Sequence, residues 1–267
     1  MNKRITSLQN ARIKRVVSLH KPGVRKKENL TVVEGYREIQ MAVTGGHEID
    51  SLFICPDIAG DETYPALDIH KKSFPVNEVN RSVYSKIAYR ENFDGIIAII
   101  APSRRKLDDL KLGANPLMLM VESCEKPGNI GAMMRTADAA GVDAVIVCDP
   151  RTDIYNPNVI RASLGSVFTN TVVACKSEEA LMWLKEKGIK IIVTALTASV
   201  PYPEPDYKVP VALAVGSEDK GISKIWTDNS DENIIIPMLG QVDSMNISVS
   251  AAIVLFEALR QRGFRKS

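Results

Sequence analysis

The sequence lacks any apolar run long enough to cross a membrane. The longest run, residues 95–101, has the length of a buried strand, whereas a membrane span needs about 18 apolar residues. Hydrophobic residues make up 45% and charged residues 25% of the 267, which excludes a disordered chain, a collagen and a coiled coil. We therefore expect a soluble, cytoplasmic protein with no membrane partner.

Histidine and cysteine are also scarce. The three histidines all lie in the first third of the chain, and no cysteines form a C-x-x-C pair. The four cysteines stand far apart, at Cys55, Cys124, Cys148 and Cys175. No group has the spacing of metal ligands, so we expect no metal and reduced, mostly buried thiols. A Ser-His or Cys-His catalytic pair at short range is excluded in the second half, which has no histidine.

Acidic residues are absent from the first 27 positions. Residues 1–113 hold 19 Lys+Arg against 14 Asp+Glu, a net charge of +5, whereas the remainder holds 15 against 18, a net −3. The nine basic residues of the first segment are Lys3, Arg4, Arg12, Lys14, Arg15, Lys21, Arg25, Lys26 and Lys27. Such a block is either a solvated face or an arm that contacts a polyanion, because each phosphate it neutralises releases counterions.

Short β-type apolar runs alternate with helical patterns, which predicts an α/β protein. The second-half strands read as continuous apolar runs, typical of a parallel sheet covered on both faces. A polar stretch closed by a proline places the domain boundary near 103–115, and the domains at 1–105 and 114–267. Strands are expected at 30–33, 52–55, 95–101, 117–121, 144–148, 189–194, 211–215 and 234–236. Helices are expected at 34–43, 77–88, 129–140, 178–187 and 247–262.

Three loops, each after a buried strand, combine glycines with polar residues. Ligands of open parallel sheets bind outside the carboxyl ends of the strands. In the loop 122–135, Asn129 is either a helix N-cap or part of an anion-binding helix start. In the loop 213–222, Gly216 and Gly221 serve ordinary turn chemistry or let backbone approach a ligand. In 234–252, Asn246 is an N-cap or a functional amide.

The motifs of these loops are N-I-G-A-x-x-R at 129–135, G-S-E-x-x-G-I at 216–222 and I-P-M-x-G-x-x-x-S-x-N-x-S-V at 236–249. In this order they resemble the three motifs of the SpoU/TrmH branch of the SPOUT RNA methyltransferases, over residues 117–262. The R-A-S-L-G-S segment at 161–166 is similar to the family's further motif. Residues 1–101 resemble its ribosomal-protein-like α/β substrate-binding domain, through I-T-S-L-Q-N at 5–10 and V-E-G-Y at 33–36. Asn170-Thr171 departs from the family's usual proline, which we interpret as a packing variation.

The resemblance implies a C-terminal trefoil-knotted methyltransferase domain that binds S-adenosylmethionine mostly through backbone groups, with no metal. The cofactor-binding positions carried over are Leu196, Thr197, Gly216, Ile236, Met238 and Met245. The catalytic positions carried over are Arg135, Asn129, Glu218, Ser244 and Asn246. Arg135 would anchor phosphate and stabilise the developing alkoxide, because a guanidinium is not deprotonated in proteins. The two asparagines would position the ribose, Glu218 would orient Arg135 or a partner subunit, and Ser244 would shape its loop.

The function implied is methyl transfer to a ribose 2′-hydroxyl of structured RNA by a homodimer formed through the knot domain. The two-domain length is similar to the ribosomal-RNA members of the family, including thiostrepton-resistance enzymes. The alternatives are a tRNA 2′-O-methyltransferase and a non-catalytic RNA-binding or ribosome-assembly protein on the same fold. A serine hydrolase is excluded, since the sequence has no G-x-S-x-G and no histidine near the candidate serines.

Overall fold

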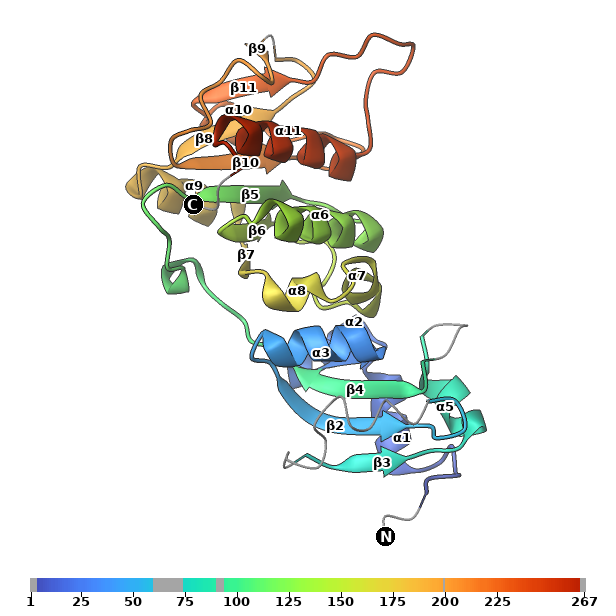
Figure 1. Cartoon of the computed structure of the whole chain (residues 1–267). Helices are drawn as coiled ribbons and strands as arrows, with labels where there is room; N and C mark the ends of the chain where they lie inside the picture. Colours follow the sequence, from blue (N-terminus) through green and yellow to red (C-terminus); the bar gives the residue numbers. More distant parts are fainter. Residues whose placement is uncertain (1–3, 60–73, 90–93, 199, 265–267) are drawn as a thin grey trace. The chain divides into compact units, whose positions relative to one another are not determined.

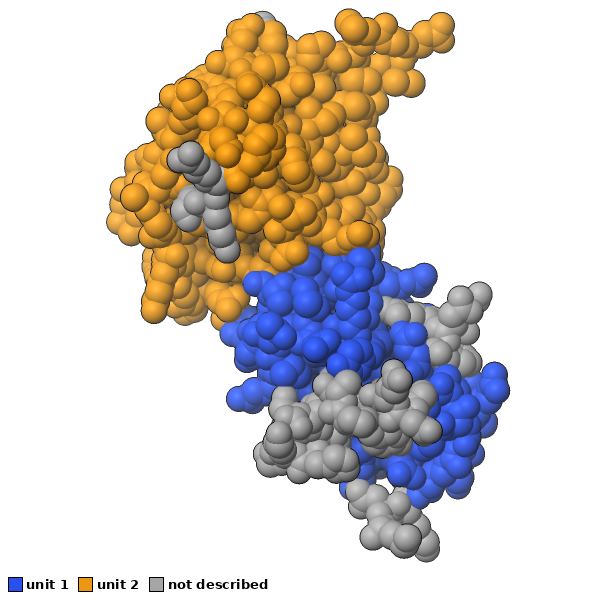
Figure 2. Space-filling model, in the orientation of Figure 1, with its two compact units in different colours: residues 1–103, 155–169 blue, residues 104–154, 170–267 orange. Residues whose placement is uncertain are grey.

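The computed structural model describes residues 4–59, 74–89, 94–198 and 200–264, which form two compact units (Figure 2). The first unit contains residues 1–103 and 155–169, and the second contains 104–154 and 170–267. Residues 155–169, which the predicted boundaries assign to the second domain, group with the first compact unit. The Thr31 hydroxyl donates to the Tyr155 carbonyl oxygen at 2.7 Å, and the His47 Nε2 lies 3.0 Å from the Phe168 carbonyl oxygen.

The first unit is a four-stranded mixed sheet with helices around it (Figure 1). The strand order is β1-β4-β2-β3, in which β4 runs antiparallel to β1 and β2, and β3 runs parallel to β2. The strands are β1 Thr31–Glu34, β2 Glu48–Ile54, β3 Val76–Glu78 and β4 Ile96–Ala101. The helices are α1 Ala11–Ser18, α2 Pro22–Glu28, α3 Tyr36–Thr44, α5 Arg81–Ile87, α7 Pro157–Ala162 and α8 Ser166–Thr169. The predicted α/β class is confirmed, and the mixed sheet was not anticipated.

The basic first segment is not an extended arm. Its helices α1 and α2 belong to the core, where Ile13, Val16 and Leu19 are buried. Arg25 is also buried, and its guanidinium donates to the carbonyl oxygens of Leu19 and His20. Three further arginines pair with Asp57, Asn77 and Asp50: Arg4, Arg12 and Arg15 respectively. These three arginines are exposed although they are paired, and Lys14, Lys21, Lys26 and Lys27 are exposed as well.

The helix expected at 77–88 is wrong in its first part. Residues 76–78 form strand β3, because Val76 pairs with Leu52 of β2 and the buried Asn77 amide donates to the Leu52 carbonyl oxygen at 3.1 Å. Helix α5 then begins after its N-cap Asn80, whose side chain accepts from the Val83 N–H at 2.9 Å. Sheet pairing therefore overrides the local helical pattern.

The second unit contains a seven-stranded sheet with the order β7-β6-β5-β10-β8-β11-β9, and every pair in it is parallel, as predicted. The strands are β5 Leu117–Glu122, β6 Ala144–Cys148, β7 Val172–Cys175, β8 Lys190–Thr194, β9 Val200–Pro201, β10 Val211–Val215 and β11 Glu232–Ile235. The helices are α6 Pro127–Ala140, α9 Ser177–Glu186, α10 Lys224–Thr227 and α11 Ile247–Gln261, with a short 3-10 turn Leu107–Asp109 before β5. The trefoil knot stays a prediction.

Helices cover both faces of this sheet. Helices α6 and α11 lie side by side on one face, and α9 and α10 pack against the apolar residues of the other (Figure 1). The Trp226 ring on α10 is fully buried, and its indole N–H donates to the Ser177 hydroxyl at 3.0 Å. Asn170, at the departure from the family pattern, donates to the Met134 carbonyl oxygen of α6 at 2.8 Å, which supports a packing role. Among the described residues, no helix has the length and apolar composition that crossing a bilayer requires.

Arg262 fixes the end of α11 to the beginning of the unit. Its half-buried guanidinium donates to the carbonyl oxygens of Tyr207, Asn115, Pro116 and Val209, at distances of 2.6–3.2 Å. Burial lowers the pKa of Arg262 from its ordinary value, against the opposing effect of Asp143 and Asp206. The side chain thus satisfies backbone oxygens that would otherwise be partly desolvated.

Arg262→Ala should therefore lower the free energy of unfolding by about 2–3 kcal/mol, because several hydrogen bonds from a charged donor are lost together. The matched control is Arg260→Ala, which removes an exposed side chain paired with Glu257 and should cost at most about 0.5 kcal/mol. Urea unfolding measures both values, and equal stabilities of the two variants would contradict the role of Arg262.

Candidate functional site

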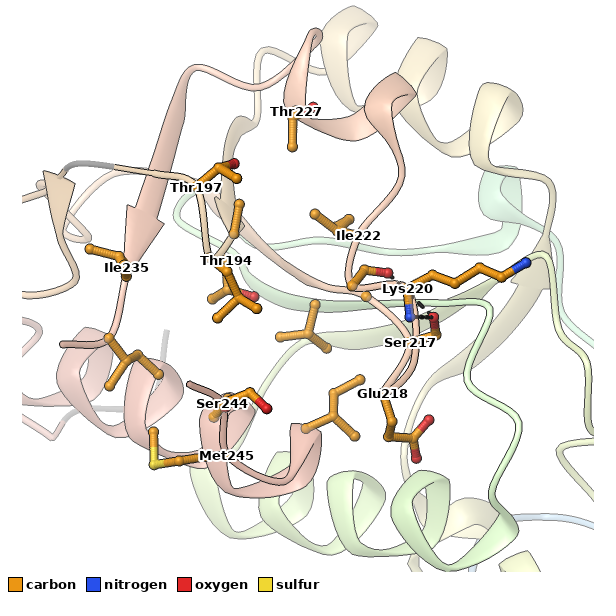
Figure 3. A pocket seen from close by; sticks show the side chains of 18 of the residues that line it. Thr194, Thr197, Ser217, Glu218, Lys220, Ile222, Thr227, Ile235, Ser244 and Met245 are labelled. Atoms are coloured by element: carbon orange, nitrogen blue, oxygen red, sulfur yellow. Dashed lines mark hydrogen bonds between the residues drawn. The ribbon is translucent and has the colours of Figure 1, made fainter. Parts of the chain in front are cut away.

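A cavity of about 500 Å³ opens at the carboxyl ends of β8, β10 and β11 (Figure 3). This is the edge at which parallel sheets bind ligands, and the volume lies within the range of small-molecule sites, about 300–1,000 Å³. The structure brings all six residues predicted for the cofactor to its wall: Leu196, Thr197, Gly216, Ile236, Met238 and Met245. Glu218, Lys220 and Ser244 also line it, and the end of the Lys220 side chain points outward (Figure 3).

The loop 216–222 is a closed turn whose two ends lie too close together for a side chain at Gly216. Ser217 and Gly221 exchange two backbone hydrogen bonds, at 2.9 and 3.0 Å, and Gly221 has a φ of +65°. A Cβ at Gly216 would overlap the Gly221 carbonyl and the Ile222 nitrogen. Gly216 is therefore needed for the close approach of the loop's two ends. This requirement holds whether or not the backbone also contacts a ligand.

Glu122, a residue the sequence reasoning missed, holds the far end of this loop. Its buried carboxylate, at the end of β5, accepts from the Ser223 N–H at 2.7 Å and from the Ser223 hydroxyl. Ser223 is the N-cap of α10, so Glu122 fixes the start of the helix whose Lys224 and Thr227 line the cavity. The available signal was an acidic residue ending a continuous apolar strand.

Three predicted catalytic residues form one chain of hydrogen bonds. The Asn129 amide donates to the Glu218 carboxylate, and its oxygen accepts from the Asn246 amide at 3.2 Å. The Asn246 oxygen accepts from the Ser248 N–H at 2.9 Å, as the N-cap of α11. Asn246 is thus both the N-cap of α11 and a hydrogen-bond partner of Asn129. The two roles predicted for this residue, helix cap and functional amide, therefore do not exclude each other.

Asn129 is not an N-cap. Lys126 precedes α6 and Pro127 is its first residue, so Asn129 lies within the first turn. A proline suits that position because its missing N–H would have had no helical partner. The side chain of Asn129 is therefore available to link the loops after β10 and β11.

Arg135 lies apart from this chain of hydrogen bonds. It is an exposed residue of α6 and does not line the cavity. The contact predicted between Glu218 and Arg135 is absent from the hydrogen bonds of the described residues, in which Glu218 accepts from Asn129 instead. Ser244 is exposed at the rim of the cavity, in the loop before α11.

The thiol nearest the site is not a nucleophile. Burial, followed by the negative charge of Glu218, raises the pKa of Cys124 to about 12, so the thiol stays protonated at neutral pH. All four cysteines are free thiols, as expected. The described residues also contain no group of three or more His, Cys, Asp or Glu side chains that could hold a metal ion. The arrangement instead offers amides, a carboxylate and a preformed cavity.

Comparisons with known proteins cover both units. Residues 116–256 match the SpoU rRNA Methylase family, and residues 10–98 match the MRM3-like substrate binding domain. The chain is 30% identical over 254 residues to the 23S rRNA (guanosine(2553)-2′-O)-methyltransferase RlmP of Bacillus subtilis, covering 95% of this chain and 98% of that protein.

Two solved structures are similar over almost the whole chain. One, described as an RNA 2′-O ribose methyltransferase, has a TM-score of 0.84 and 37% identity, covering 97% of this chain and 99% of that one. The other is an AdoMet-bound rRNA methyltransferase from Sinorhizobium meliloti, with a TM-score of 0.87, 30% identity and 97% coverage of both chains.

The contact between Glu122 and Ser223 leads to a prediction about the loop 216–223. Glu122→Ala should lower the free energy of unfolding by about 2–3 kcal/mol and speed amide exchange in this loop, because the Ser223 N–H loses its acceptor. Ser223→Ala should have a smaller effect, since it removes only the hydroxyl bond.

The matched control is Glu125→Ala, a change at an exposed carboxylate that pairs with Arg151. Hydrogen exchange read out by mass spectrometry reports on the loop directly. Unchanged exchange at 216–223 in the Glu122 variant would show that the loop holds itself closed.

Proposed function

Because the chain belongs to the SpoU rRNA methylase family, we propose that it methylates the ribose 2′-hydroxyl of a guanosine in 23S rRNA. The chain is an S-adenosylmethionine-dependent RNA 2′-O-ribose methyltransferase. The observation that carries the choice of RNA is the match to RlmP along 95% of the chain, which includes the substrate-binding unit as well as the catalytic one.

The cavity suits S-adenosylmethionine. Its volume of about 500 Å³, its mixed polar and apolar wall and its closed glycine loop would give a preformed site in which backbone groups meet the ligand. Leu196, Thr197, Gly216, Ile236, Met238 and Met245 would hold it. When bound, this cofactor supplies an electrophilic methyl group on a positively charged sulfur.

The chain's own residues must orient and activate the hydroxyl. A ribose 2′-hydroxyl is a poor nucleophile at neutral pH, so its proton must leave as the new bond forms. Asn129 and Asn246, fixed by Glu218 and by the N-cap of α11, would hold the ribose. Arg135, exposed on α6, would bind the adjacent phosphate and stabilise negative charge on the hydroxyl oxygen.

The first unit would capture the RNA. Its exposed lysines, Lys14, Lys21, Lys26 and Lys27, remain free of the structural role that the neighbouring arginines have taken. Phosphate contacts of this kind position an RNA without reading its sequence. An RNA substrate and free thiols are also consistent with a cytoplasmic enzyme.

A homodimer through the second unit is supported by its surface. Val249 and Phe256 are exposed on α11, seven residues apart and hence on one side of the helix, and Leu239 is 98% exposed in the preceding loop. These apolar side chains would be covered by a second copy of the chain, which would bring additional residues close to the cavity.

The test is methylation of purified 23S rRNA, 16S rRNA and tRNA with radiolabelled S-adenosylmethionine, followed by mapping of the 2′-O-methyl position. The proposal expects label in 23S rRNA at a guanosine. Label confined to tRNA, or no transfer to any of the three RNAs, would overturn it.

Asn246→Asp separates the cap from the catalytic contact. Asp caps a helix about as well as Asn, so stability should be retained, but it cannot donate to the Asn129 oxygen. Methylation should fall by about 10- to 100-fold through misplacement of the ribose. The control is Asn80→Asp at the N-cap of α5. A variant as active as the wild type would remove Asn246 from the catalytic set.

Arg135→Ala should lower kcat by about 100- to 1,000-fold while the affinity for S-adenosylmethionine changes by less than about twofold, because the guanidinium would act on the phosphate and hydroxyl of the RNA and not on the cofactor. Lys at this position should restore part of the rate through its charge. Lys185→Ala, an exposed cation on α9, is the control. If calorimetry finds the cofactor affinity reduced as much as the rate, the assignment fails.

A further inference from the structure

A second hollow, of only about 10 Å³ and so with room for about one water molecule, lies within the first unit and takes no part in the site described above. It is lined by Val32, Glu34, Tyr89, Pro157, Ile160 and Arg161, which come from β1, from α7 and from the segment after α5. Its floor is therefore partly apolar, and its wall includes an aromatic ring residue and a guanidinium. These are the two kinds of side chain on which unpaired RNA bases stack.

Tyr89 is held in place although it is 38% exposed. Its backbone N–H donates to the Glu34 carboxylate at 2.7 Å. Its ring meets the ring of His20 edge-on, with the centroids 4.8 Å apart and an interplanar angle of 74°. An exposed tyrosine normally moves among rotamers, and that freedom would be lost on binding. In this protein the contacts with Glu34 and His20 already restrict Tyr89, so less conformational entropy would be lost on binding.

The fixation of Tyr89 uses a buried carboxylate. Glu34 is 7% exposed, and it also lies 3.5 Å from the Tyr84 hydroxyl. A carboxylate is costly to bury unless it is well hydrogen-bonded. The buried Glu34 accepts from the Tyr89 N–H, so this contact helps to fix the backbone that carries the exposed ring.

The segments next to the ring carry cationic residues. Arg161 lines the hollow, Lys86 is exposed three residues before Tyr89, and Lys21 is exposed next to His20. The pKa of His20 is lowered, first by burial and also by the charges of Arg25 and Lys86, so its ring is neutral and adds no further charge. An aromatic ring among cations complements a base flanked by phosphates.

We propose that one unpaired base of the RNA substrate stacks on the exposed Tyr89 ring at the edge of this hollow, outside it, with Arg161 against the base and Lys86 and Lys21 on the flanking phosphates. The proposal rests on the proposed function for the identity of the ligand as RNA. It adds a recognition point in the first unit that accepts single-stranded RNA and excludes a continuous duplex, whose bases are not available for stacking.

The test measures RNA affinity of the full-length protein for a 23S rRNA transcript and for a short oligouridylate. Tyr89→Ala should weaken binding by between about 5-fold and about 150-fold, the effect of one base stacked on an aromatic side chain. Tyr89→Phe should bind within about twofold of the wild type, because the ring is retained. Phe264→Ala, a change at a ring 68% exposed in the second unit, is the matched control.

Two further readouts separate stacking from charge and from damage to the fold. Lys86→Gln should reduce the slope of log affinity against log salt by about 0.7, whereas Tyr89→Ala should leave the slope unchanged. In the Tyr89→Trp variant, fluorescence of the added indole should be quenched by RNA. The thermal midpoint and the affinity for S-adenosylmethionine should match the wild type in every Tyr89 variant.

The proposal is overturned if Tyr89→Ala binds both RNAs like the wild type, or if Tyr89→Phe loses as much affinity as Tyr89→Ala. Absence of quenching in the Tyr89→Trp variant on bound RNA would also overturn it. Failure of the proposed function is distinguishable, since it shows as an absence of methyl transfer to 23S rRNA while the oligouridylate measurements still decide the role of Tyr89.

Discussion

The hydrogen-bond chain from Glu218 through Asn129 to Asn246 is the contact on which the site depends. It joins the loops after β10 and β11 to the first turn of α6, three segments that are far apart in the sequence. Each amide uses both its donor and its acceptor, so the orientation of one asparagine determines that of the next. A site made from three separate loops needs such a coupling, because loops are otherwise the most mobile parts of a fold.

Three further contacts hold in place the helices and strands next to the Glu218–Asn129–Asn246 hydrogen-bond chain. Glu122 fixes the start of α10, the buried Trp226 ties α10 to Ser177, and Arg262 ties the end of α11 to the residues before β5. None of the three lines the cavity. The second unit therefore separates two tasks, since buried polar contacts position the loops and exposed or rim residues are left for the proposed contacts with the substrates.

The basic residues at the start of the first unit are also divided between two tasks. Of the nine basic residues in the first 27, Arg4, Arg12, Arg15 and Arg25 bind carboxylates, an amide or carbonyl oxygens of the unit itself. Arginine suits this because its fork of donors can satisfy several acceptors at once. We propose that the exposed lysines contact a polyanion and that the Tyr89 ring adds what charge alone does not provide, a surface for a base.

The sequence by itself determined the α/β class, the parallel sheet of the second unit and most of its strands, because continuous apolar runs are a local signal. The three motifs also contain four of the six predicted residues that line the cavity, Gly216, Ile236, Met238 and Met245, and the members of the Glu218–Asn129–Asn246 chain. Only the tertiary structure decided that Val76–Glu78 is a strand, since that depends on pairing with Leu52. It also decided that residues 155–169 pack with the first unit. The roles of Glu122, Arg262 and Tyr89 come from partners that are 101, 147 and 55 residues away, and no local pattern encodes contacts of that range.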